Sequence, residues 1–162
     1  VAAYELAEYF SQKGLTNVHQ MNIGGTTELA GVRISMTFST HSSSTMENGM
    51  RVYLGPAAGY VLRAPDLPTV YISGDTGLFG DMKFIGEYYR PDVVLIPIGG
   101  HYVLDPKDAA FAVNNWLKPK HAVPMHYGQN ILLKGKPEAV LTALGSTPTT
   151  VHHITPGDKL EF

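Results

Sequence analysis

The stretch Val70-Tyr-Ile-Ser-Gly-Asp-Thr-Gly77 is the part of this 162-residue sequence on which the fold prediction depends. Its first three residues are β-branched or aromatic, which is typical of a buried strand. The strand breaks at Ser73-Gly74, and Asp75 follows at once. A carboxylate at the end of a strand can be a reactive group that the sheet holds in place. It can equally cap the next helix, with Asp81 as a rival cap, and this stretch alone leaves both interpretations open.

Outward from this stretch, the pattern predicts alternating strands and helices in one domain of residues 1–162. We expect extended segments at 18–23, 26–29, 32–40, 59–64, 69–73, 93–98, 121–125, 151–154 and 159–162. We expect helices at 4–13, 81–89, 106–117 and 137–144. Asp105 is the expected cap of the third helix. The continuous apolar run at 93–98 favours a strand covered on both faces, whereas Asn48-Gly49 and Gly55-Pro56 predict turns within residues 45–56.

The composition allows a real core and excludes several kinds of partner. Hydrophobic residues make up 44% of the chain and charged residues 16%, with a formal net charge of −2. No basic run is present, so we expect no nucleic-acid partner. No apolar stretch is long enough to span a bilayer, so we expect no membrane partner. The chain has no cysteine, so a metal must be held by imidazole and carboxylate, and we expect a cytoplasmic location.

Four metal-capable side chains follow strands in the same way. His41, Asp75, His101 and His126 each come directly after a predicted strand. If these strands share one direction, the four side chains collect along one edge. Neutral imidazole and carboxylate are good ligands for Zn²⁺, Mn²⁺ or Fe. The remaining histidines lack this placement and are expected to be structural: His19, His121, His152 and His153.

Four short runs carry a resemblance to a known family. They are Thr-His-Ser-Ser-Ser at 40–44, Ser-Gly-Asp-Thr-Gly-Leu-Phe at 73–79, Pro-Ile-Gly-Gly-His-Tyr at 97–102 and Pro-Met-His-Tyr at 124–127. In this order they resemble the metallo-β-lactamase superfamily. More narrowly, they resemble the bacterial and archaeal UPF0173 metal-dependent hydrolases, which are similar to the ascorbate-phosphate lactonases. The resemblance covers essentially the whole chain, and it implies an α/β fold, the αβ/βα sandwich, with a two-metal site at one edge.

The resemblance also implies roles for individual residues. His41 matches a histidine ligand of one metal, Asp75 matches the carboxylate that bridges both metals, and His126 matches the last histidine ligand, on the second metal. His101 is not a standard ligand, and its place in a cleft-facing loop implies substrate contact, proton transfer or only loop stabilisation. Asp75 and His101 are therefore the expected catalytic residues. The implied cofactors are two divalent ions, Zn²⁺ first, with Mn²⁺ or Fe as alternatives.

One motif of the family is missing from this sequence. His-x-His-x-Asp-His belongs upstream of the helix at 4–13, and nothing here matches it. We therefore expect a sandwich that is incomplete at its N-terminal side, with this chain as the C-terminal portion of the hydrolase. An upstream fragment or a second chain would supply the remaining ligands, and activity is expected only after that completion. A homo-oligomer is also expected.

The expected function is hydrolysis by a water that two metal ions activate. The substrate is expected to be a small molecule with an ester, lactone, thioester or phosphodiester bond, since the ligands do not choose among these. Two alternatives stay open at this point. One is a diiron redox protein on the same scaffold, and the other is a non-catalytic fragment that needs a partner chain.

Overall fold

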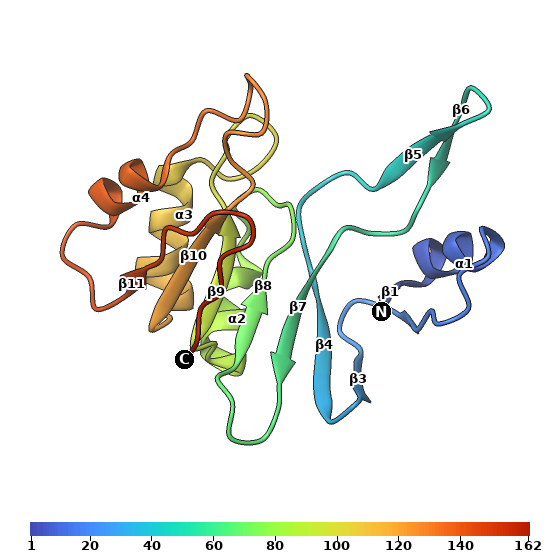
Figure 1. Cartoon of the computed structure of the whole chain (residues 1–162), viewed down its shortest axis with the longest axis horizontal. Helices are drawn as coiled ribbons and strands as arrows, with labels where there is room; N and C mark the ends of the chain where they lie inside the picture. Colours follow the sequence, from blue (N-terminus) through green and yellow to red (C-terminus); the bar gives the residue numbers. More distant parts are fainter.

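The largest element of the computed structural model, which describes all 162 residues, is a mixed sheet of seven strands (Figure 1). Side by side, the strands are β11 (Thr150–Val151), β10 (His121–Met125), β9 (Val93–Pro97), β8 (Val70–Ile72), β7 (Ala58–Arg63), β4 (Val32–Phe38) and β3 (Thr26–Leu29). Strands β8 to β11 are parallel, whereas β7, β4 and β3 alternate in direction. Strand β4 therefore points the same way as β8, β9 and β10, and their carboxyl ends share one edge.

Helices cover one face of this sheet. They are α2 (Asp81–Tyr89), α3 (Pro106–Ala112), the π-helical turn η1 (Val113–Leu117) that continues α3, and α4 (Pro137–Leu144). Each helix connects neighbouring parallel strands, and β8 to β11 follow one another in one direction across the sheet. Because such crossovers are right-handed, successive steps in one direction place every helix on the same face. The main core lies beneath these helices, where Tyr71, Val94 and Ile96 are at most 1% exposed.

The opposite face of the sheet has no such helical layer. Side chains alternate along a strand, so Leu62, Ile72 and Leu95 point to this second face. All three are only half-buried. The C-terminal residues cover part of this face: they cross β10 in Figure 1, and the ring of Phe162 lies 4.6 Å from the ring of His121. The sheet thus has one finished face and one partly open face.

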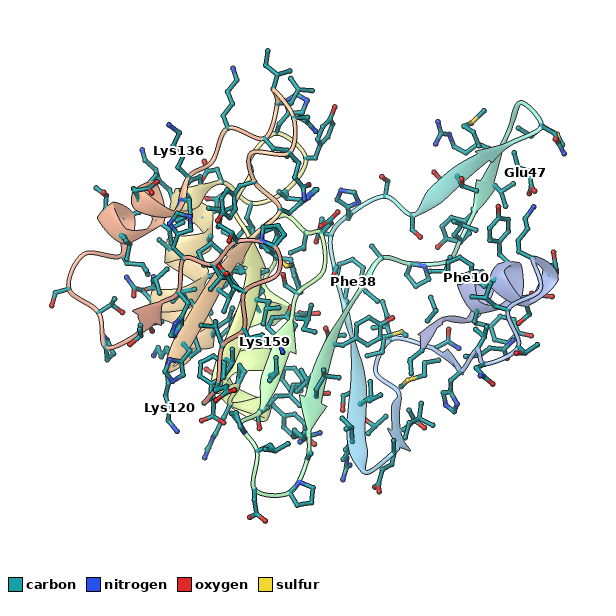
Figure 2. All side chains as sticks on the ribbon, in the orientation of Figure 1. Phe10, Phe38, Glu47, Lys120, Lys136 and Lys159 are labelled. Carbon is teal, nitrogen blue, oxygen red and sulfur yellow. The ribbon has the colours of Figure 1, made fainter.

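The N-terminal residues and a hairpin project from one side of the sheet (Figure 1). Strand β1 (Ala2–Ala3) precedes helix α1 (Tyr4–Gln12) in the chain, and strand β2 (Gln20–Met21) follows it. The two strands pair with each other in parallel. The hairpin consists of β5 (Ser44–Glu47) and β6 (Met50–Tyr53). An ion pair between Lys13 and Glu47 joins α1 to the hairpin, and Figure 2 shows Glu47 and Phe10 on this projection.

The hairpin is an element for which the sequence predicts only turns. Asn48 (φ 50°) and Gly49 (φ 78°) form its two-residue connection. Two consecutive residues with positive φ match the twist of paired strands, which is why Asn-Gly is a hairpin signal. The prediction for Asp105 is confirmed, because its side chain accepts hydrogen bonds from the backbone N–H groups of Lys107 and Asp108. None of the helices is long and apolar enough to span a membrane.

The predictions at several element ends are wrong. Residues 159–162 form no strand, because Phe162 packs by its ring against His121 and not through backbone pairing. Strand β11 ends at Val151, one residue before His152. The extended segment predicted at 18–23 shrinks to β2, and the helix predicted at 106–117 changes to π-helical winding after Ala112.

Candidate metal centre

The shared edge of β4, β8, β9 and β10 holds a pocket of about 490 Å³. The residues that line it follow the ends of these four strands: Thr40, His41, Ser42, Asp75, His101, Tyr102 and His126. All four predicted site residues are therefore in one pocket. The four strands that precede these residues point in the same direction, as the sequence prediction required.

Of the four predicted site residues, His126 and Asp75 face each other across this pocket. Nε2 of His126 lies 3.4 Å from Oδ2 of Asp75. On the other side of the ring, Nδ1 lies 2.8 Å from Oε1 of Gln129. A carbonyl oxygen only accepts, so Nδ1 carries a hydrogen, and in the neutral ring the lone pair of Nε2 then faces the carboxylate. Two facing lone pairs are unfavourable alone, and a cation between them would relieve the repulsion.

His41 has the same ring arrangement. Its Nδ1 lies 2.8 Å from the carbonyl oxygen of Ser42, which leaves Nε2 free to act as a ligand. A histidine that binds metal usually donates its other ring N–H to an oxygen in this way. The donor chemistry of His41, Asp75 and His126 therefore fits a divalent metal such as Zn²⁺.

The side chains do not converge into a finished site. No three histidine, aspartate or glutamate side chains lie close enough together to hold one ion. Asp75 and His126 are in contact, whereas His41 and His101 line the same pocket without contacting them. The ligand set of His41, Asp75 and His126 stays a prediction.

His101 occupies a strained position in the loop after β9. Its φ is 57°, in the left-handed region that non-glycine residues seldom adopt, and His126 shares this conformation with a φ of 53°. The ring of His101 meets the ring of Tyr102 edge-on, with centroids 4.3 Å apart. Strain of this kind persists only where the surroundings impose it, and it is common near functional groups. The role of His101 stays open.

The alternative reading of Asp75, as a helix cap, is wrong. Helix α2 begins at Asp81, its N-cap is Gly80, and no side chain caps it. Gly74 aims Asp75 into the pocket instead, because it has a φ of 65°. A Cβ on Gly74 would lie 2.6 Å from the carbonyl oxygen of Ala58, so only glycine fits there.

Thr76 is a positioning residue that the sequence interpretation missed. It is fully buried, and its Oγ1 accepts a hydrogen bond from the backbone N–H of Thr40 at 2.9 Å. Its carbonyl oxygen accepts from the N–H of Leu104 at 2.8 Å. Thr76 therefore ties the loops after β4, β8 and β9 together. The only signal in the sequence is its place next to Asp75.

The histidines predicted to be structural lie outside this pocket. His19 contacts Oγ1 of Thr27 at 3.2 Å, and His121 contacts His152 at 2.9 Å between Nδ1 and Nε2. His153 lies 3.9 Å from a carboxylate oxygen of Glu138. Each has a partner away from the shared strand edge.

Known proteins with similar sequences were found over most of this chain. A family model described as a beta-lactamase superfamily domain matches residues 2–127. A UPF0173 metal-dependent hydrolase of Polaromonas sp. is 42% identical over 153 residues, which cover 90% of this chain and 56% of that protein. A protein of the same name from Chloroflexus aurantiacus is 42% identical over 165 residues, covering 99% of this chain and 67% of the relative. The chain thus spans little more than half of the first relative and two thirds of the second.

A solved structure shares the fold. Igni18, a metallo hydrolase from Ignicoccus hospitalis, superposes with a TM-score of 0.79 at 35% sequence identity. The match covers 99% of this chain and 67% of Igni18. The strand order and the single helical layer described above are therefore a known arrangement for a protein of this sequence type.

Proposed function

This chain belongs to the metallo-β-lactamase superfamily and, within it, to the UPF0173 metal-dependent hydrolases, and on that premise we propose that the complete protein hydrolyses a small-molecule substrate with bound metal. The observation that carries the proposal is the facing pair of Asp75 and His126, whose ring is oriented by Gln129. A carboxylate and an oriented imidazole at a strand edge are a suitable start for a metal site.

His41, Asp75 and His126 are the proposed ligands of two divalent ions, with Zn²⁺ as the first choice and Mn²⁺ or Fe as alternatives. Asp75 suits a bridging role because its carboxylate has two oxygens. Gln129 and the carbonyl of Ser42 hold the two imidazoles in the tautomer that a ligand needs. When bound, such ions make water nucleophilic at neutral pH and polarise the bond under attack.

His101 is the proposed contact to substrate or leaving group. It lines the same pocket, and no hydrogen bond commits its ring nitrogens. In hydrolysis, the water oxygen bonds to the acyl carbon or phosphorus atom, and the leaving alcohol or thiol departs with a proton. An imidazole beside the pocket can deliver that proton. The bond class stays an ester, lactone, thioester or phosphodiester.

A second polypeptide or an upstream stretch is proposed to complete the site. Two observations support this proposal: no three potential ligands lie close enough to hold an ion, and the second face of the sheet leaves Leu62, Ile72 and Leu95 half-buried. An apolar sheet face is rarely left open in a soluble monomer. The upstream part would cover this face and supply the missing ligands, and the completed protein is proposed to form a homo-oligomer.

The test measures metal content and ester hydrolysis of this chain alone and mixed with the upstream polypeptide. The mixture should take up about two ions per complex, as elemental analysis can count, whereas the chain alone should bind metal weakly or aggregate. Asp75→Ala should remove metal and activity together. His101→Ala should lower turnover and keep the metal, and His19→Ala, outside the pocket, should change neither.

Two results would contradict this reading. Equal loss of metal in the Asp75→Ala and His101→Ala variants would make His101 a ligand. A soluble, monomeric and fully active hydrolase consisting of residues 1–162 would refute the need for completion.

A further inference from the structure

A second pocket lies directly beside the candidate metal centre. Its volume is about 590 Å³, and its walls come from the end of β4, the loop that leads to β5, and the residues around the end of β6. His41 and Ser42 line both this pocket and the metal-centre pocket. A molecule held with its reacting bond at the metal centre can therefore extend past His41 into this second space.

Arg51 carries the only full charge among the side chains that line this second pocket. The guanidinium Nη1 donates a hydrogen bond to Oγ of Ser44 at 2.9 Å, which holds the group in place. No carboxylate forms an ion pair with it. A guanidinium has five N–H donors in a fixed planar fork, so most of them remain free for an anion.

The other walls of this pocket add hydrogen-bond donors and no negative charge. Ser42, Ser43 and Ser44 contribute hydroxyl groups, and Tyr53 contributes a phenol. The nearest acidic group of the hairpin, Glu47, is already paired with Lys13. Beyond the lining side chains, the carboxylate of Glu5 lies against the backbone of Gly55 at this pocket. An anionic group that enters the pocket therefore meets several donors and one cation, with Glu5 as the negative charge nearby.

A third pocket, which also adjoins the metal-centre pocket, is the rival site for an anion. It measures about 420 Å³, shares His101 with the metal-centre pocket, and is lined by Lys134 and Lys136. Asp105 also lines it, and its carboxylate accepts hydrogen bonds from the backbone N–H groups of Lys107 and Asp108. The lysine ammonium groups have no planar fork for an anion. The pocket with Arg51 therefore suits a carboxylate or phosphate better.

We propose that Arg51 and the serines at 42–44 form a binding subsite for an anionic group of the substrate, next to the bond that is hydrolysed. This inference rests on the proposed hydrolase function and narrows its substrate class. The substrate is then a small ester, lactone, thioester or phosphodiester that carries a carboxylate or phosphate apart from the reacting bond. Arg51 determines specificity, since it binds a part of the substrate that does not react.

The test compares a neutral and an anionic ester in the complete, metal-loaded protein. The probes are 4-nitrophenyl acetate and mono-4-nitrophenyl glutarate, which share the leaving group, whereas only the glutarate ester has a longer acyl chain that ends in a carboxylate. Arg51→Gln should raise KM for the glutarate ester about 10- to 100-fold, the value of one or two charge-assisted hydrogen bonds. It should leave kcat, and KM for the acetate ester, within about twofold.

Two further variants separate charge, geometry and location. Arg51→Lys should have a KM between those of the parent and Arg51→Gln, because it keeps the charge and loses the fork. Lys136→Gln, in the rival pocket, should leave both KM values unchanged. A selective effect in Lys136→Gln, or an equal rise of KM for both esters in Arg51→Gln, would overturn the inference.

A binding measurement keeps this inference separate from the proposed function. Free glutarate is titrated into the metal-free protein at low ionic strength, and its binding is followed by NMR line broadening. Weaker binding in Arg51→Gln than in the parent and in Lys136→Gln supports the subsite, even if neither ester is hydrolysed and the hydrolase proposal fails. No binding, or binding that Arg51→Gln leaves unchanged, contradicts the subsite.

Discussion

Leu95 and Ile96 are neighbours on β9 and lie on opposite faces of the sheet. Ile96 is 1% exposed beneath the helices, whereas Leu95 is only half-buried on the second face. The same difference separates Tyr71 from Ile72 on β8. The two faces are similar in composition, and they differ in what covers them.

This difference follows from the connections of the chain. Every parallel crossover from β8 to β11 steps in one direction, so right-handedness places α2, α3 and α4 together. No crossover of this chain can then supply a helix to the second face. The C-terminal residues give this face partial cover, with the ring of Phe162 against the ring of His121 on β10. The open face is thus a consequence of topology, and it is the basis for the proposed upstream partner.

The largest effect is expected on the finished face. Ile96→Ala should lower the free energy of unfolding by about 2–5 kcal/mol, because the tight packing beneath the helices cannot fill the space left by the removed atoms. Urea denaturation followed by circular dichroism measures this. A loss below about 1 kcal/mol would mean that the helix-covered core is loosely packed, and the contrast between the faces would fail.

On the open face, a substitution should have a smaller effect on the free energy of unfolding, and its size should depend on whether the upstream polypeptide is present. Leu95→Ala should cost about 1 kcal/mol or less in the chain alone, since its side chain stays partly in water. With the upstream polypeptide present, the cost should rise to about 2 kcal/mol or more. The same denaturation experiment, performed with and without the partner, checks this. An unchanged cost would show that the partner does not cover this face.

The smallest effect is expected from the pH dependence of stability at His152, which belongs to the C-terminal residues that partly cover the open face. Burial, followed by the charge of His121, lowers the pKa of His152 from its ordinary value of 6.5. The folded state therefore binds fewer protons than the unfolded state just below pH 6.5. This contribution to stability is complete above that pH and is lost as the pH falls through the folded-state pKa.

Unfolding midpoints of the parent and His152→Gln between pH 7.5 and 5.5 test this prediction. The parent should lose slightly more stability than the variant as the pH falls, since two protonated rings cannot share the hydrogen bond between His121 and His152. If the unfolding midpoints of both proteins change with pH in the same way, His152 does not cause the pH dependence of stability.

Much of the fold was predictable from local pattern. The strands at 32–38 and 93–97 and the cap at Asp105 each depend on neighbours in sequence, and all are present in the structure. Burial in β4 does not simply alternate between apolar and polar residues, since Ser35 and Thr37 are buried and Phe38 is exposed. The solved relative confirms the predicted fold class. The run at 93–98 predicts a strand covered on both faces, and β9 largely agrees: Val93, on the same face as Leu95, is 2% exposed, and only Leu95 is half-buried.

The candidate site was predictable to the level of a shared pocket. His41, Asp75, His101 and His126 were identified because each follows a strand, and all of them line one pocket. The roles of Gln129 and Thr76 were not predictable, since both act on groups that other strands or loops position.

The sequence by itself determined the order of the main strands and helices from β3 to β10, apart from the hairpin of β5 and β6, as well as the turn at Gly74 and the edge at which Asp75 is presented. These properties follow from side-chain period and backbone preference, which act over a few residues. Only the tertiary structure decided that Ile96 is buried while Leu95 is half-buried, and that His126 faces Asp75. It also decided that Arg51, which has no carboxylate partner, lines a pocket together with His41. Each of these depends on segments distant in sequence, and burial and charge pairing are determined where such segments meet.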